Sequence, residues 1–251
     1  MKKIFRRYSI SKNCKGSHIG VILSFIIFVT FLVFIYSTLE PAIKTEKDKR
    51  FILEYLEATM IDKLSTNLTT LTVTIDKSIN KKCLVLKDLI KSSPQLNQKI
   101  IVKDESKNDV ISYISAEDGD DLIIQRENSE KTFFKIYGSE EFAVLPEEKI
   151  EECEVLTNEY EINLLKSGEY TSKIKILKMK EDYLVDYENL KKELRIPAGS
   201  EFGFNFTFND GTFIETEEEN VLKSVYVDEI SVQYIDSSAN ILQGYLKIWV
   251  W

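Results

Sequence analysis

Cysteines are the residues of this 251-residue chain whose chemistry can be interpreted most directly, and there are three of them. Cys83 and Cys153 come after a long apolar segment, whereas Cys14 precedes it. Disulfides persist outside the reducing cytoplasm. If the apolar segment exports the residues after it, Cys83 and Cys153 are both exported and are predicted to form one disulfide. The alternative is two separate buried thiols, each packing as a small apolar residue.

The sequence offers few residue types that could act in catalysis. The single histidine, His18, stands at the edge of the apolar segment, so the rest of the chain lacks the group needed for Ser-His-Asp or Cys-His catalysis and for histidine-ligated zinc. Neither a G-x-x-x-x-G-K nor a G-x-G-x-x-G motif occurs. Carboxylate pairs could act as acid and base, but among 41 acidic residues no pair stands out. We therefore expect neither an enzyme nor a bound cofactor.

An acidic turn is the one candidate for a metal site. Residues 117–121 read Glu-Asp-Gly-Asp-Asp, and hard cations such as Ca²⁺ need several oxygens held in a tight loop. The segment lacks the spaced ligands of an EF-hand. A solvated hairpin turn is therefore the better interpretation, and no metal is expected.

Two sites fit the pattern for N-glycosylation, Asn67-Leu-Thr and Asn205-Phe-Thr. Asn67 lies where a predicted helix meets the first predicted strand, which suits an attached sugar. Asn205 stands between phenylalanines, so it can accept a sugar only if its side chain faces outward. Two such sites are close to the number that chance supplies, and alone they mean little.

The side of the membrane on which all these residues lie depends on one element, an uncharged run of eighteen positions, residues 19–36. A helix rises about 1.5 Å per residue and the hydrocarbon core is about 30 Å thick. We predict a transmembrane helix over 19–39. A buried core helix is the alternative, but such a helix rarely lacks a polar face over five turns.

Charge predicts the orientation of that helix. Residues 1–18 carry six Lys and Arg and no acid, which favours a basic leader on the cytoplasmic side. The rest of the chain carries the other 27 Lys and Arg and all 41 acids, so the formal net charge of the exported part is −14. This balance argues against nucleic acid or anionic lipid as a partner of the exported part, and it favours solubility. An uncleaved signal anchor explains the same features, since the run is long for a cleaved signal and no A-x-A site comes after it.

An amphipathic helical stalk is predicted over 40–66, because apolar side chains recur there at helical spacing. Pro41 would lie near its junction with the transmembrane helix and could kink it. From residue 67 to 251 the pattern changes to short alternating runs separated by polar turns, typical of an antiparallel, sandwich-like β domain. The overall fold class is thus α+β.

Local signals refine this picture of the β-rich region. We expect a short helix near 186–194 with Asp186 as its N-cap, and a strand over 172–178. A domain boundary or connecting helix is predicted within 146–165. Phe202, Phe204, Phe206 and Phe208 alternate, so they share one sheet face and are expected in the core, as are Trp249 and Trp251.

The N-terminal pattern resembles archaeal type IV prepilins. Lys15-Gly16 directly precedes the apolar stretch, and in that family a membrane peptidase cuts after such a pair, which implies a mature chain beginning at Ser17. Many pilins carry a glutamate five residues into the mature chain, where this sequence has Val21. A second block, Leu194-x-Ile-Pro followed by Phe202-Gly-Phe, resembles a passage of uncharacterised archaeal membrane-anchored proteins and implies no activity.

The resemblance implies a subunit of a surface filament or envelope assembly. Its apolar helices would pack together in the lipid bilayer, with Gly20, Ser24 and Thr30 as close-contact positions. The implied partners are the bilayer, copies of the chain or related subunits, and a prepilin-type peptidase. The alternative is a monomeric single-pass surface protein whose β domain binds a ligand or an envelope partner. Both interpretations place the C-terminal region outside the cell membrane.

Overall fold

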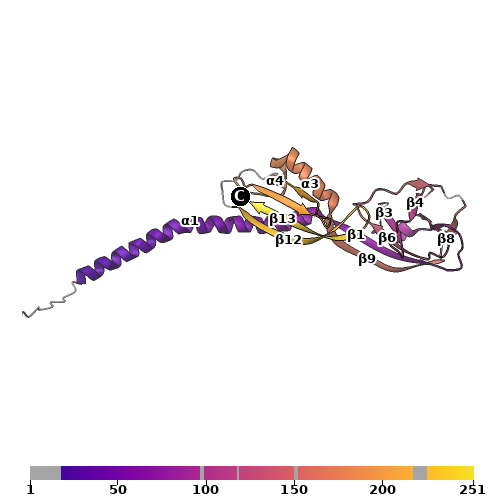
Figure 1. The fold of residues 1–251 in the computed structure, drawn as a ribbon, viewed down its shortest axis with the longest axis horizontal. Coiled ribbons are helices and arrows are strands. Elements are labelled where there is room, and N and C mark those ends of the chain that lie inside the picture. The colour runs from indigo at the N-terminus through magenta and orange to yellow at the C-terminus, as the bar shows by residue number, and fades with distance from the viewer. Residues whose placement is uncertain (1–17, 97–98, 118, 150–151, 217–224) are drawn as a thin grey trace, which may run out of the picture. The chain divides into compact units, whose positions relative to one another are not determined.

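The computed structural model describes residues 18–96, 99–117, 119–149, 152–216 and 225–251 (Figure 1). The chain divides into two compact units, residues 1–50 and residues 51–251. The first unit consists, in its described part, of most of helix α1 (His18–Leu64). Everything else belongs to the second unit, which is an α+β fold with a large, mainly antiparallel sheet.

The last turns of α1 belong to the core of the second unit. Leu53, Leu56, Met60 and Leu64 are all buried, and their spacing of three and four residues places them on one helix face. This stripe overlaps the predicted amphipathic face. The helix ends at Leu64, and Ser65 begins the first strand, two residues before the predicted end of the stalk.

Two sheets make up the second unit. The larger has the order β11-β10-β13-β12-β9-β1-β6-β3 and the smaller the order β7-β4-β5-β2-β8. The strands are β1 (Ser65–Ile75), β2 (Cys83–Leu86), β3 (Ile100–Asp104), β4 (Ile111–Ser115), β5 (Leu122–Gln125), β6 (Phe133–Gly138), β7 (Glu147–Glu148), β8 (Glu154–Leu156), β9 (Tyr160–Ser172), β10 (Phe202–Thr207), β11 (Phe213–Glu215), β12 (Tyr226–Ile235) and β13 (Ile241–Val250).

One half of the large sheet is covered by helices. The helices α3 (Lys173–Val185) and α4 (Tyr187–Glu193) pack with the end of α1 on strands β10 to β13 (Figure 1). Phe202, Phe204, Phe206 and Phe208 supply the sheet side of this core, and each is at most 6% exposed. The prediction that these four side chains are core residues is confirmed.

The other half of the large sheet is covered by the small one. Side chains of β1, β3 and β6 pack against those of β2, β4, β5 and β8 in a second apolar core, and a short helix α2 (Leu89–Ser92) adds to it. This half is a sandwich, as expected. The sheets are mainly antiparallel, as predicted, but three of the strand pairs among the described residues are parallel: β9 with β12, β2 with β8, and β4 with β7.

Two local predictions are corrected. Residues 172–178 were expected to form a strand, but α3 begins at Lys173, where Ser172 caps the helix by accepting a hydrogen bond from the Lys175 N–H at 2.9 Å. The described part of the stretch 146–165, predicted as a domain boundary or a connecting helix, contains β7, β8 and the start of β9 instead of a helix, and the boundary stays a prediction. The helix near 186–194 is present as α4, with Asp186 accepting from the Asn189 N–H at 3.3 Å.

Trp249 and Trp251 are buried, at 3% and 7% exposure, as expected. Trp249 lies on the sheet face opposite the phenylalanines and covers Gly203, its partner on β10. A Cβ added to Gly203 would lie 2.5 Å from two atoms of the indole ring. Only a glycine therefore lets the ring approach the backbone this closely.

Candidate functional site

The apolar part of α1 is the most exposed apolar surface of the described residues. One helix there, His18–Glu40, is long and apolar enough to cross a membrane by length and composition, and none of it is buried. Ile19, Phe25 and Phe34 expose 76%, 65% and 64% of their surface. Transmembrane helices have this length and composition, and a signal sequence near the N-terminus has them too.

The three predicted helix-packing residues lie on this segment. Gly20 and Ser24 are one turn apart and share a face, while Thr30 lies on an adjacent face. No atom lies within 4 Å of a Cβ added to Gly20, so a neighbouring helix could approach its backbone. The Thr30 hydroxyl donates to the Ile27 carbonyl at 2.9 Å, which satisfies it within the helix. The predicted cleavage residues Lys15, Gly16 and Ser17 lie outside the described residues.

The structure joins Cys83 and Cys153 in a disulfide with a Cα–Cα distance of 4.6 Å. Cys83 is the first residue of β2, and Cys153 directly precedes β8. The two strands are parallel neighbours, with Leu84 paired to Glu154, so their pairing brings the two cysteines together. Cys14 lies outside the described residues.

Both predicted glycosylation sites are on strands of the large sheet. Asn67 is exposed on β1, opposite Glu169 of β9. Asn205 lies on β10 with its side chain on the face opposite Phe204 and Phe206, and its Oδ1 accepts a hydrogen bond from the Thr207 hydroxyl at 3.0 Å. The outward orientation required of Asn205 is therefore met.

Of the acidic segment 117–121, the structure describes residues 117 and 119–121, which lie between β4 and β5, and Gly119 adopts a positive φ of 71° there. Asp121 is 3% exposed and accepts a hydrogen bond from the Asp88 N–H at 2.7 Å. This bond links Asp121 to the turn that contains Asp88. Within the part of the chain that the structure describes, no group of three or more His, Cys, Asp or Glu side chains could hold a metal ion.

A groove of about 390 Å³ lies between the end of α1, α3 and α4, and no pattern in the sequence indicated it. It carries both charge signs, with Lys63 paired to Glu193 and the Lys175 ammonium donating to the Ser65 carbonyl. Three lysines and three carboxylates line it, so the groove offers no net charge to select a ligand. Its lining residues are Lys63, Lys175, Lys178, Met179, Asp182, Asp186, Asn189, Leu190 and Glu193.

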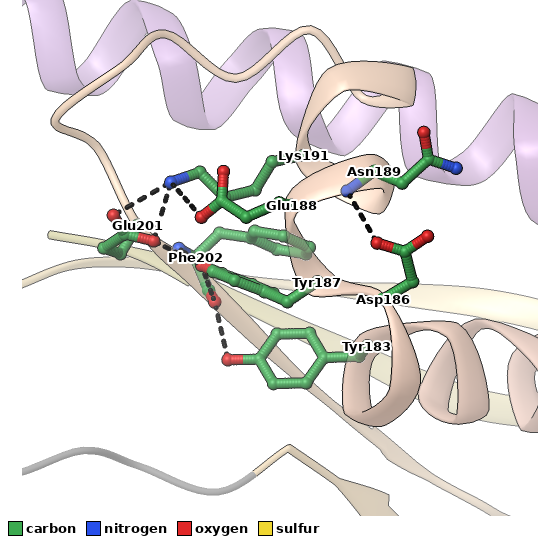
Figure 2. Close-up of polar contacts among 8 residues, drawn as sticks. All are labelled: Tyr183, Asp186, Tyr187, Glu188, Asn189, Lys191, Glu201 and Phe202. Atoms are coloured by element: carbon green, nitrogen blue, oxygen red, sulfur yellow. Dashed lines mark hydrogen bonds and ion pairs between the residues drawn. The ribbon is translucent and has the colours of Figure 1, made fainter.

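A half-buried polar cluster fastens α4 to the start of β10 (Figure 2). The Lys191 ammonium donates to both oxygens of Glu201 at 2.8 Å, and the Tyr187 hydroxyl donates to Glu201 at 2.8 Å. Burial is the largest cause of the raised pKa of Tyr187, so its phenol stays protonated as a donor. The Tyr183 hydroxyl donates to the Phe202 carbonyl at 3.0 Å.

Sequence reasoning missed this cluster, because Tyr183 lies in the last turn of one helix, Tyr187 begins the next, and the break at Asp186 removes any helical spacing between them. The side chains of Lys191, Tyr187, Glu201 and Tyr183 all have hydrogen-bond partners inside the cluster. These hydrogen bonds have a structural role, because they hold the short helix α4 against the sheet.

Comparisons with family models, with curated proteins and with solved structures found no match to this chain.

Proposed function

We propose that this protein is a membrane-anchored structural or interaction protein, a pilin-like subunit of a surface filament or envelope assembly. Its N-terminus lies in the cytoplasm, and its β-rich region lies outside. The chain acts by assembly rather than by catalysis.

The observation that carries the proposal is the apolar helix His18–Glu40, none of which is buried and which precedes a folded unit containing a disulfide. A soluble protein would cover such a surface. The disulfide agrees with export, because such bonds are rare in the cytoplasm. The basic leader supports the orientation, and Lys15-Gly16 supports processing by a prepilin-type peptidase.

The second candidate is a monomeric single-pass surface protein whose β-rich unit binds a ligand or an envelope partner. Val21 favours it, since pilin assembly commonly uses a glutamate at that position of the mature chain. An uncleaved anchor would then keep the chain in the bilayer as a single copy.

Mass spectrometry of the intact protein, purified from its native membrane, separates the two candidates. A chain beginning at Ser17 supports prepilin-type processing, and electron microscopy of sheared surface material should then show filaments that contain it. A chain beginning at Met1, with no filaments, contradicts the pilin-like proposal and leaves the monomeric anchor.

A further inference from the structure

The glycosylation site at residues 67–69 lies on a strand, although such sites usually lie in surface loops. All three residues belong to β1, which pairs with β9 along its whole length. Thr69 is paired on both sides, with Ser167 of β9 and with Gly138 of β6. The end of this site is therefore an interior part of the sheet.

Within this site only the asparagine is accessible. Asn67 is exposed, whereas Leu68 and Thr69 expose only 2% and 3% of their surface. The Thr69 hydroxyl shares a hydrogen bond of 3.0 Å with the Ser167 hydroxyl. The hydroxyl that distinguishes this site from any other asparagine is thus buried and already bonded.

The chemistry of the transfer depends on that hydroxyl. The side-chain nitrogen of Asn67 forms a bond to C1 of an oligosaccharide, the bond from C1 to the phosphate of its lipid carrier breaks, and the amide gives up one proton. The pattern requires a hydroxyl two residues after the asparagine, so a transferase must reach Thr69 as well as Asn67. A transferase cannot reach Thr69 in the folded sheet.

We propose that Asn67 accepts a sugar only before β1 pairs with β6 and β9, so that its glycosylation precedes folding of the exported unit. Exposing Thr69 afterwards would break the pairing of β1 on both sides. Opening a core strand costs nearly as much free energy as unfolding the whole unit. This inference rests on the export in the proposed function, because the transfer takes place on the exported side.

A sugar attached before folding is compatible with the finished sheet. Asn67 lines a polar groove of about 340 Å³, together with Gln95, Ser139 and Glu169. Amide, hydroxyl and carboxylate groups form hydrogen bonds with sugar hydroxyls. The folded unit therefore has room for the first sugar beside Asn67.

The second site, at residues 205–207, is enclosed in the same way. Asn205 and Thr207 each pair with β11 on one side and with β13 on the other, and Phe206 between them is 0% exposed. The Thr207 hydroxyl donates to Asn205 Oδ1 at 3.0 Å. Both sites should therefore be closed to a transferase in the folded protein.

A purified N-glycosyltransferase with a lipid-linked oligosaccharide tests this order on the full-length, unglycosylated chain in detergent. Mass spectrometry of peptides measures the sugar at each site. Asn67 of the folded parent should be modified at least about a hundredfold more slowly than Asn67 of a Phe134→Asp chain. Phe134 is 0% exposed on β6, so a carboxylate there unfolds the sheet around β1 without changing the site itself.

Glu130→Thr supplies the matched control, because it creates a glycosylation site at Asn128 in an exposed turn. Asn128 should accept the sugar at similar rates in the folded chain and in a chain that also carries Phe134→Asp. The new site thus reports whether the folded protein is a substrate wherever its acceptor residues are accessible.

Modification of Asn67 in the folded parent as fast as that of Asn128 would overturn the inference. A Phe134→Asp chain modified at Asn128 but not at Asn67 would also overturn it, because folding would then not be what closes the site. The assay needs no membrane insertion, so the inference can fail while the proposed function stands. A β-rich unit that is never exported would refute the proposed function without changing the rates in this assay.

Discussion

At the scale of single residues, Gly203 shows how a missing side chain shapes the sheet. The Trp249 ring rests on its backbone, and the ring is itself 3% exposed. Gly203→Ala forces a Cβ against a packed aromatic ring, so we expect a loss of about 1–3 kcal/mol in unfolding free energy. Urea unfolding followed by circular dichroism measures it.

A second variant tests whether the Trp249 ring causes this loss of stability. In a Trp249→Leu background the ring is absent, and the same Gly203→Ala change should cost clearly less. An equal cost in both backgrounds would mean that backbone conformation, rather than the ring, requires glycine here.

Glu141 is a buried residue whose ionisation should make stability depend on pH. It is 5% exposed, it accepts hydrogen bonds from the Ser172 hydroxyl and the Ile174 N–H, and burial raises the pKa of its carboxyl above the usual 4.5. Since the folded state holds the proton more tightly than the unfolded state, the stabilisation is complete below about pH 4.5 and is lost as pH rises through the raised value.

Glu141→Gln removes this titration. The unfolding free energy of the parent chain should decline with rising pH in that window more steeply than that of the variant. Glu161→Gln, at an exposed position of β9, serves as the control and should keep the parent slope. If the unfolding free energy of Glu141→Gln changes with pH as steeply as that of the parent, another group causes the pH dependence.

At the scale of elements, α3 shows where local pattern and tertiary structure conflict. Residues 172–178 alternate lysine with apolar residues, which over so short a window indicates a strand. In the fold, helical spacing buries Ile176 and Met179, and Ser172 caps the helix. A longer window including Tyr183 would have favoured the helix, because burial of a helical stripe outweighs local alternation.

The disulfide is the element-scale bond with the largest expected contribution to stability. It links residues 70 apart, at the starts of paired strands β2 and β8. Cys83→Ser should lower the unfolding free energy by roughly 3–4 kcal/mol, because the unfolded chain regains the freedom of that loop. Urea unfolding of the parent chain with and without reductant should show the same loss.

Cys14→Ser is the control for that measurement and should unfold like the parent. If reductant destabilises the parent and Cys83→Ser equally, then the cross-link between Cys83 and Cys153 does not carry the effect.

At the scale of the whole molecule, the kinds of element were easier to predict from the sequence than their order in the sheets. The apolar helix and the alternation of Phe202, Phe204, Phe206 and Phe208 on one sheet face are indicated by periodicity alone. The pairing of β1 with β9, and of β9 with β12 in parallel, joins segments far apart in the chain. No local signal in the sequence specifies these strand partners. They are selected by the burial of apolar side chains from distant segments in two cores.

The candidate sites divide in the same way. Residue type and position relative to the apolar segment predicted the bond between Cys83 and Cys153, and local sequence pattern predicted glycosylation at Asn67 and Asn205. The ion pair of Lys191 with Glu201 could not be predicted without the fold, since it depends on which face of α4 meets the sheet.

The proposed function depends above all on the helix His18–Glu40 spanning a membrane and exporting the unit after it. This is tested by labelling Ser231→Cys, at an exposed position of β12, with a membrane-impermeant maleimide on intact cells. We expect full labelling of the introduced cysteine before lysis, while the thiols of a cytoplasmic marker enzyme stay unlabelled. Labelling of Ser231→Cys only after lysis would contradict export of the β-rich unit.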